Sequence, residues 1–184
     1  TRVEMTQMPQ MVAIFNGFGG GASALIASAE YLSNYQNNSL SMFLVITITL
    51  SVFIGTLTLT GSFIAFGKLQ GFISGQPILF PGQQPFNALL AIGIVVSSYL
   101  LASGNLDNLN TFYAIIAISA LMGITLTIPI GGADMPVVIS LLNSYSGVAA
   151  SATGFVLMNN GLIIAGALVG ASGLILTNIM CKGM

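Results

Sequence analysis

Apolar residues along the chain fall into six runs, each long enough to cross the hydrocarbon core of a bilayer, which takes about 20 helical residues. The runs cover residues 9–32, 40–67, 86–103, 110–130, 135–157 and 161–181. Polar or turn-forming stretches separate them, at residues 33–39, 70–85, 103–108, 131–132 and 158–161. The pattern predicts an all-α fold, a polytopic membrane bundle of six transmembrane helices.

The composition agrees with a membrane protein. Of the 184 residues 55% are hydrophobic and 4% are charged, whereas a soluble domain carries about 25% charged residues. Three basic residues in all leave no basic patch for nucleic acid. The sequence has no histidine, no acidic residue near Asp134 and a single cysteine, Cys181, so it offers neither a catalytic triad nor a metal site. Function is therefore sought among polar groups inside the membrane.

The few charged residues predict an orientation. Threading six spans through a bilayer places Arg2, Lys68 and Lys182 at one face. Cytoplasmic loops are the ones that retain Lys and Arg, so this face is expected to be cytoplasmic. Asp134, in the turn between the fourth and fifth spans, falls on the same side.

Small and hydroxyl residues recur at helical spacing in four of the spans, and each set forms a stripe on one helix face. Small side chains let backbones approach closely, so the stripes predict a tight bundle. We expect Gly147, Gly154, Gly170 and Gly173 to serve helix packing. The stripes are Gly17, Gly21, Ala24 and Ser28; Thr47, Ser51, Gly55, Thr58 and Ser62; Asn143, Gly147, Ser151 and Gly154; and Gly166, Gly170, Gly173 and Thr177.

The segment 130–147, IGGADMPVVISLLNSYSG, holds the densest chemistry of the chain. Pro136 suits the first turn of a helix, and Asp134 is placed to cap that turn through its side-chain oxygen. Asn143 lies nine residues further on, which is roughly 13 Å deeper at ~1.5 Å per residue and near the middle of the bilayer. We expect Asn143 to be buried there, where its amide needs a hydrogen-bond partner or water.

Polar residues at membrane depth are costly and are by default candidates for a pathway. The stripe that begins at Asn143 is expected to line the same wet interior as Asn16. Two other interpretations stay open, because Asn143 could serve only an interhelical hydrogen bond and Asp134 only a helix cap. The candidates for a proton pathway are Asn16, Asp134, Asn143, Ser140, Ser144 and Ser151.

The segment 130–147 resembles the membrane part of the beta subunit of the proton-translocating nicotinamide nucleotide transhydrogenases. Four further stretches carry the same resemblance from one end of the chain to the other. These are VEMTQMPQMVAIFNGFGGGASAL (3–25), TGSFIAFGKLQG (60–71), PILFPGQ (77–83) and GALVGASGLILTNIMCKGM (166–184).

The resemblance implies hydride transfer between NAD(H) and NADP(H), coupled to proton passage through the membrane. Residues 1–184 then form the transmembrane proton-translocating domain, an excerpt that lacks upstream helices and a downstream NADP(H)-binding domain. NADP and NAD are expected on other domains of the complex and none in this chain. The implied partners are an alpha-type subunit with an NAD(H)-binding domain and the NADP(H)-binding domain of the same subunit. The complex is expected to be a homo-dimer in a bacterial inner membrane or the mitochondrial inner membrane.

Individual residues follow from the same resemblance. Asp134 and Asn143 match functionally important polar residues of the family, and Gly173 matches a helix-packing glycine. Asn16 occupies the place of a histidine that some members use in proton transfer, and Gln7 replaces an acidic residue that some members carry. An asparagine does not titrate near neutral pH, so a titrating group is expected from another chain or a missing part.

Three classes of function remain in competition at this point. The first is the proton-conducting domain of an oxidoreductase, the second a secondary transporter for a small solute, and the third a structural membrane anchor. A transporter would show an internal repeat and discontinuous spans, and no register aligns the two halves of this sequence. An anchor would not require a buried Asn143 or a polar mouth at Asp134.

Overall fold

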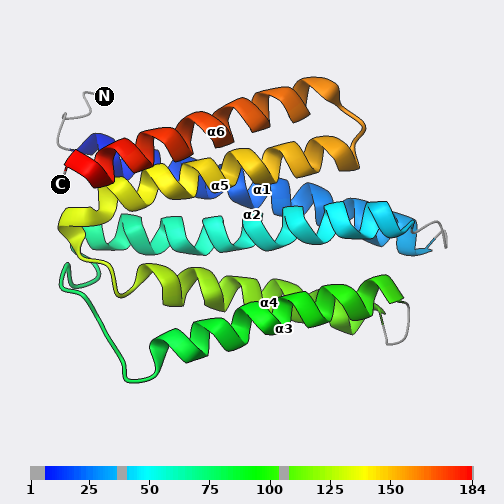
Figure 1. Cartoon of the computed structure of the whole chain (residues 1–184), viewed down its shortest axis with the longest axis horizontal. Coiled ribbons are helices and arrows are strands. Elements are labelled where there is room, and N and C mark those ends of the chain that lie inside the picture. Colours follow the sequence, from blue (N-terminus) through cyan, green and yellow to red (C-terminus); the bar gives the residue numbers. More distant parts are fainter. Residues whose placement is uncertain (1–6, 37–40, 104–107, 184) are drawn as a thin grey trace.

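In the computed structural model, which describes residues 7–36, 41–103 and 108–183, the chain forms six long helices. These residues contain no strand, and each helix is long and apolar enough to cross a membrane. The prediction of an all-α six-helix bundle is therefore confirmed. The helices are α1 (Met8–Gln36), α2 (Met42–Leu69), α3 (Gln83–Ser103), α4 (Asn108–Thr127), α5 (Met135–Val156) and α6 (Asn160–Gly183), as Figure 1 shows.

Three helix boundaries differ by three or four residues from the predicted ones. Helix α1 runs on to Gln36, through the first half of a polar stretch that was predicted to be a loop. Helix α4 ends at Thr127 rather than at 130, because Pro129 disfavours helical geometry in the residue before it. Helix α3 begins at Gln83, and Pro85 is accommodated in its first turn, where a missing amide proton costs nothing. Residues 37–40 and 104–107 of the predicted breaks lie outside the described residues.

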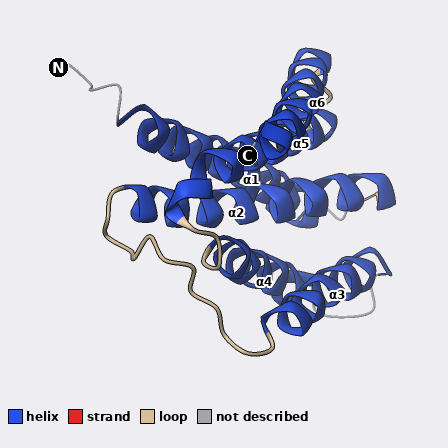
Figure 2. Ribbon diagram, turned by 60° about the vertical axis from the view of Figure 1, so that its left-hand side comes forward, coloured by secondary structure: helices blue, strands red, loops and turns tan. Residues whose placement is uncertain are grey.

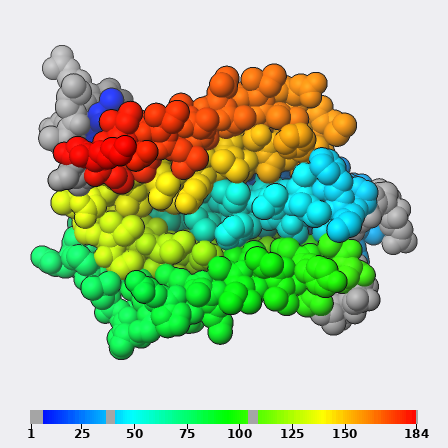
Figure 3. Space-filling model, in the orientation of Figure 1, coloured from blue at the N-terminus to red at the C-terminus, as the bar shows by residue number. Residues whose placement is uncertain are grey.

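Helix α2 is the centre of the bundle. It packs against α1, α5 and α4, while α6 packs on α5 and α3 packs mainly on α4. Two views show the same division, with α1, α2, α5 and α6 together and α3 and α4 to one side (Figures 1 and 2). We call the first group the four-helix block and the second the α3–α4 pair. On the face drawn in Figure 3, α6 forms one edge of the molecule and α3 the opposite edge.

Glycines set the distance between α1 and α2. A Cβ atom added at Gly55 would lie 2.5 Å from the carbonyl oxygen of Gly20, and one added at Gly20 would lie 2.8 Å from the carbonyl oxygen of Gly55. A Cβ atom added at Gly17 would likewise lie 3.2 Å from the Cβ of Ser62. Real Cβ atoms do not approach backbone oxygens this closely, so only glycine permits the contact at Gly20 and Gly55. The predicted α1 and α2 stripes do meet, although the tightest contact uses Gly20, which was not among the predicted stripe residues.

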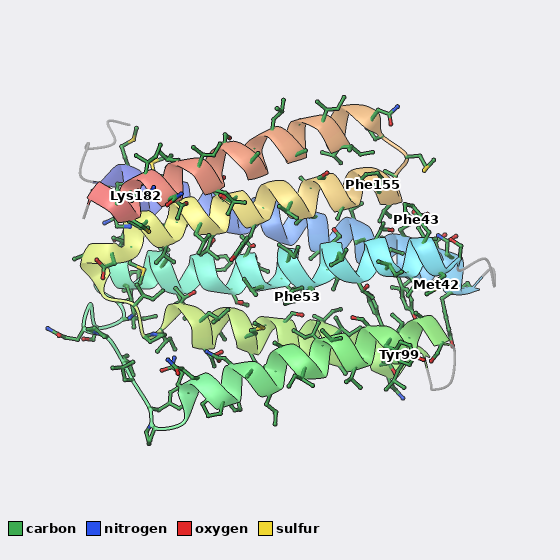
Figure 4. The ribbon with its side chains drawn as sticks, in the orientation of Figure 1. Met42, Phe43, Phe53, Tyr99, Phe155 and Lys182 are labelled. Carbon is green, nitrogen blue, oxygen red and sulfur yellow. The ribbon has the colours of Figure 1, made fainter. Side chains whose placement is uncertain are left out.

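Two apolar clusters fill the ends of the bundle. At one end the rings of Tyr31 and Phe112 stack with centroids 4.1 Å apart, within a cluster that includes Ile48 and Val156. The other cluster is built around Met135, with Ala13, Leu57, Ala65, Val138, Ile139 and Leu142. Figure 4 shows Met42, Phe43 and Phe155 at the end of the bundle opposite to Lys182.

The two described lysines lie at one end of the molecule. Lys68 is in the last turn of α2 and Lys182 in the last turn of α6. The turn that carries Asp134 lies at this end too (Figure 1). This agrees with the predicted grouping, while Arg2 lies outside the described residues. That this end faces the cytoplasm stays a prediction.

Candidate functional site

The side-chain amide of Asn16 joins three helices in the interior of the bundle. Its Nδ2 donates a hydrogen bond to Ser62 Oγ on α2 (3.0 Å), and Ser146 Oγ on α5 donates to its Oδ1 (2.7 Å). Asn16 is buried, and Ser62 is completely so. We call these three residues the Asn16 cluster. An amide both donates and accepts, so the cluster is a continuous chain of hydrogen bonds across α2, α1 and α5.

The sequence pointed to Asn16 but not to the residues that bind it. Ser62 was assigned only to a packing stripe, and Ser146 was not singled out at all. One signal was available, because Ser146 follows Asn143 by three residues in the same polar segment and therefore neighbours it on the helix surface.

A second buried polar cluster lies nearer the N-terminal end of α2. Ser51 Oγ and Thr153 Oγ1 share a hydrogen bond of 2.6 Å between α2 and α5. Ser51 also donates toward the carbonyl oxygens of Ser23 (3.3 Å) and Ala149 (3.4 Å), and Thr153 donates to Ala149 (2.9 Å). Both hydroxyl side chains are buried. Ser51 precedes Ser62 by eleven residues, so this Ser51 cluster lies about 16 Å from the Asn16 cluster along the helix axis.

Asn143 is exposed, which corrects the prediction that it is buried. It lines a groove of about 410 Å³ between α1, α5 and α6. The reason is the rotation of α5, which turns Ile139, Leu142 and Ala149 into the core. Asn143 therefore lies on the strip of α5 between the face that packs on α1 and the face that packs on α6. The groove is lined by Met8, Pro9, Val12, Pro136, Ile139, Ser140, Asn143, Leu176 and Met180.

Ser140 and Ser144 belong to the contact between α5 and α6. Thr177 Oγ1 on α6 donates to Ser140 Oγ (3.0 Å), and Ser144 Oγ donates to the Ser140 carbonyl (3.1 Å). A Cβ atom added at Gly173 would collide with Ser144 Oγ. Within the described part of the chain no hydrogen bond links these two serines to the Asn16 cluster, so the structure separates candidates that the sequence grouped together.

The stripe from Asn143 to Gly154 does not line one interior with Asn16, contrary to expectation. A Cβ at Gly147 would lie 2.5 Å from the Gly170 amide nitrogen, and one at Gly154 would lie 2.7 Å from that of Ile163. A Cβ at Gly170 would in turn lie 3.1 Å from a methyl group of Val148. These glycines sit in the contact between α5 and α6. Ser151 is half-buried and lines a separate groove with Phe43, Thr47, Leu50, Val148, Ala152, Phe155 and Ala167.

Asp134 stands directly before α5, but its side chain does not cap the helix. Its backbone has φ −89° and ψ −2°, the helical region, because residues 132–134 form a 3₁₀ turn. A capping residue needs the extended region to bring its side chain back onto the first free amides. The predicted cap is therefore wrong, whereas Pro136 does lie in the first turn of α5. Asp134 is exposed, and so is Gln7.

Lys68 is buried, with 4% of its surface exposed, although the sequence suggested a loop charge at the membrane surface. Its Nζ donates to the carbonyl oxygens of Ile128, Ile130 (2.7 Å) and Gln76 (3.4 Å). Two of these carbonyls follow the C-terminus of α4, where a positive charge is favoured. The Gly132 amide further donates to the Gly75 carbonyl (2.8 Å). We call residues 128–134 the mouth turn, and Lys68 fixes one side of it.

The chemistry of this interior is limited to hydrogen bonding. The Asn16 and Ser51 clusters contain only amide and hydroxyl side chains, which neither titrate near neutral pH nor bind transition metals well. No group of three His, Cys, Asp or Glu that could hold a metal occurs among the described residues. Such groups can pass a proton along a chain of hydrogen bonds, with water as a further member, but cannot perform acid–base or redox catalysis themselves.

The comparisons with known proteins agree over the whole chain. Residues 1–184 match the family model of the NAD(P) transhydrogenase beta subunit. Curated relatives named NAD(P) transhydrogenase subunit beta, from Rhodospirillum rubrum and from a strain of that species, are 46% identical to this chain over 188 residues. The alignment covers 100% of this chain and 40% of each relative. The chain therefore spans less than half the length of the curated relatives it matches.

Proposed function

The chain belongs to the NAD(P) transhydrogenase beta subunit family, and we propose that its six helices form the proton-conducting membrane domain of that enzyme. Proton passage here is coupled to hydride transfer between NAD(H) and NADP(H), which takes place on other domains. The observation that carries the proposal is the Asn16 cluster, a chain of hydrogen bonds buried between three helices. Polar chains of this kind at membrane depth are a hallmark of ion and proton pathways.

The route we propose begins in the groove that Asn143 lines at the end of the bundle near Asp134. Asn143 lies one helical turn from Ser146, so a water molecule in the groove can reach from the exposed amide to the cluster. Ser146, Asn16 and Ser62 then continue the route toward the centre of α2. Asn143 serves as the entry station in this scheme, in place of the buried station predicted from the sequence.

Asp134 has a different role in this proposal. Its carboxylate is exposed beside the mouth turn and makes no capping bond, so the charge is free to act on a docked partner. We place the NADP(H)-binding domain of the same subunit there, at the cytoplasmic end of the bundle. An alpha-type subunit with the NAD(H)-binding domain completes the complex, which forms a homo-dimer in a bacterial inner or mitochondrial inner membrane. NADP and NAD bind to those domains and not to this chain.

The secondary transporter and the structural anchor are less well supported. The four long helices that form the block are continuous, whereas transporters build their substrate sites from broken helices. An anchor has no use for a buried amide that is hydrogen-bonded to two other helices, because apolar packing serves that purpose at lower cost.

The experiment that tests the proposal replaces Asn16 in the complete transhydrogenase, reconstituted into liposomes. Asn16→Leu removes both side-chain hydrogen bonds while keeping a similar side-chain volume. Proton pumping and hydride transfer should therefore fall together by about tenfold or more, which corresponds to an activation barrier higher by about 1.4 kcal/mol. Asn178→Leu is the matched control, since Asn178 is exposed on α6. Normal pumping by a folded Asn16→Leu enzyme would exclude the Asn16 cluster from the route.

A further inference from the structure

The hydroxyl group of Thr58, at the centre of α2, is buried without a partner. Thr58 has no exposed surface, and its Oγ1 makes no hydrogen bond within the described part of the chain. Burial of a hydroxyl in that state destabilises the folded protein. Such a group therefore calls for an explanation.

Seven other threonines of the bundle show that the absence of a bond is not a consequence of helical geometry. The hydroxyls of Thr47, Thr49, Thr60, Thr125, Thr127, Thr153 and Thr177 each donate to a carbonyl three or four residues earlier in their own helix. This local bond is the ordinary way in which a threonine satisfies itself inside a membrane helix. Thr58 does not make this bond to its own helix, so its hydroxyl stays available to a ligand that can donate and accept hydrogen bonds.

Thr58 lies between the two buried polar clusters. Ser51, Thr58 and Ser62 follow one another at intervals of seven and four residues on α2, so they share one helix face. At ~1.5 Å per residue, Thr58 is about 6 Å along the axis from Ser62 and about 10 Å from Ser51. One water molecule spans about 5.5 Å between two oxygen partners. One water nearly closes the gap of about 6 Å on the Ser62 side, and three waters, which together span about 11 Å, close the gap of about 10 Å on the Ser51 side.

The tight contact between α1 and α2 lies at the same level. A Cβ added at Gly20 would lie 3.0 Å from Thr58 Cβ and 3.2 Å from its methyl carbon, in addition to its contact with Gly55. The methyl group of Thr58 thus packs against α1, which fixes the side chain. A proton passing from one cluster to the other along this face must pass the level of this contact, where Thr58 provides the hydroxyl.

We propose that Thr58 Oγ1 is a relay station that binds water and connects the Asn16 cluster to the Ser51 cluster. The inference rests on the proposed function, because it extends the same proton route past the middle of the bundle. The ligand is water, the small molecule that can both donate to and accept from a hydroxyl in so confined a place. The relay turns two separate clusters into one route that runs from Ser62 to Ser51, about 16 Å along α2.

The transfer step conserves charge and atoms. An excess proton on the water at the Ser62 side bonds to Thr58 Oγ1 while the proton that Thr58 carried leaves for the water at the Ser51 side. Two O–H bonds break, one on the first water and one on Thr58 Oγ1, and two form, one on Thr58 Oγ1 and one on the second water. Nothing is oxidised or reduced, and reorientation of the hydroxyl restores the starting state. Passage in the opposite direction uses the same steps in reverse.

The test is a pair of substitutions in the complete enzyme in liposomes, with proton pumping, hydride transfer and thermal stability measured together. Thr58→Val keeps the shape and removes the hydroxyl, and Thr58→Ser keeps the hydroxyl. Thr49→Val is the matched control, because Thr49 is also buried on α2 but bonds only to its own helix. A relay predicts that Thr58→Val slows pumping by about tenfold or more, whereas Thr58→Ser and Thr49→Val pump within about twofold of the parent enzyme.

Stability separates a relay from a structural role. Removal of an unpartnered buried hydroxyl leaves the melting temperature unchanged or raises it, so slow pumping by a Thr58→Val enzyme of undiminished stability supports the relay. Normal pumping by Thr58→Val, or a Thr58→Ser enzyme as slow as Thr58→Val, would overturn it. If Thr58→Val pumps normally while Asn16→Leu does not, the relay fails and the proposed function stands. If both pump normally, the proposed function fails as well.

Discussion

The four-helix block and the α3–α4 pair are equally apolar but are built differently. In the block, glycines bring backbones into contact, and Asn16, Ser62, Ser51 and Thr153 are buried between helices. Helix α3 buries few side chains, and Leu89, Ile92, Val95 and Tyr99 point outward as large exposed residues. Hydropathy alone does not distinguish these helices. The positions of glycine and hydroxyl residues do, because close approach and buried hydrogen bonds both need small or polar side chains on a shared face.

This comparison supports the proposal that the proton route runs inside the block rather than along α3. Helix α4 is the intermediate case, since it packs on α2 through Gly123, where an added Cβ would collide with Thr60 and Leu57. Buried serine and threonine on α4, Ser119 and Thr127, bond only to carbonyls of their own helix. Helix α4 therefore supports α2 without joining the chain of hydrogen bonds.

The most direct test of this difference is to replace one glycine by alanine in each region, which adds one methyl group. Gly55→Ala places a Cβ 2.5 Å from the Gly20 carbonyl oxygen, whereas Gly93→Ala on α3 meets nothing closer than a methyl carbon of Ile118 at 3.7 Å. We expect Gly55→Ala to lose about 1–3 kcal/mol of stability or to fail to fold. Gly93→Ala should be neutral or stabilising by up to about 1 kcal/mol.

Thermal unfolding of the purified complex in detergent measures both changes. Equal melting temperatures for Gly55→Ala and Gly93→Ala would mean that α1 and α2 can move apart at no cost. The division between a tightly packed block and a loosely packed pair would then be wrong.

A loss of stability of the same order, but without failure to fold, is expected where the two regions are joined. Lys68 on α2 donates to carbonyls that follow α4, so it ties the block to the pair at the mouth turn. Lys68→Met keeps the length of the side chain but leaves the carbonyls of Ile128 and Ile130 without this donor. We expect a loss of about 1–3 kcal/mol and faster hydrogen exchange at the amides of the mouth turn.

Lys182→Met is the control for this change, because Lys182 is exposed in the last turn of α6. It should alter stability by no more than about 0.5 kcal/mol. If Lys68→Met matched it in stability and in hydrogen exchange, the carbonyls would have found other donors, and the mouth turn would not depend on the lysine.

The comparison also explains what could be predicted from the sequence. Six spans follow from runs of apolar residues, because the bilayer imposes their length. The small-residue stripes indicated that α1 and α2 meet, and Asn16 stood out as an amide at membrane depth. The rotation of each helix about its axis was not available, since it depends on contacts such as that of Gly20 with Gly55. This is why Asn143 was expected in the core and Ser146 was overlooked.

Two errors at and beside the mouth turn have different causes. A capping role for Asp134 was inferred from residue type and position, but capping also depends on backbone angles, which the 3₁₀ turn at residues 132–134 determines. Lys68 was placed at the membrane face because it directly follows the apolar run 40–67. Its burial depends on carbonyls sixty residues away along the chain, a partnership that no local pattern reveals.

The smallest expected change in stability concerns Asp134, on the connection from the pair to the block. Because its side chain makes no capping bond, Asp134→Asn should change stability by no more than about 0.5 kcal/mol. Ser41→Ala is the informative contrast, since Ser41 Oγ does accept the Leu44 amide at the start of α2 (3.2 Å), and loss of such a cap costs about 1 kcal/mol.

In function the order is reversed: Asp134→Asn should alter the coupling of proton pumping to hydride transfer, and Ser41→Ala should not. Ser41 lies at the far end of α2 from the mouth turn, so Ser41→Ala should leave the ratio of protons pumped to hydrides transferred unchanged in liposomes. Asp134→Asn deletes the charge that we place against the nucleotide-binding domain, so hydride transfer should continue while fewer protons are pumped per turnover. An Asp134→Asn enzyme that is less stable but normally coupled would show that the carboxylate acts as a cap after all, and that the docked domain does not use its charge.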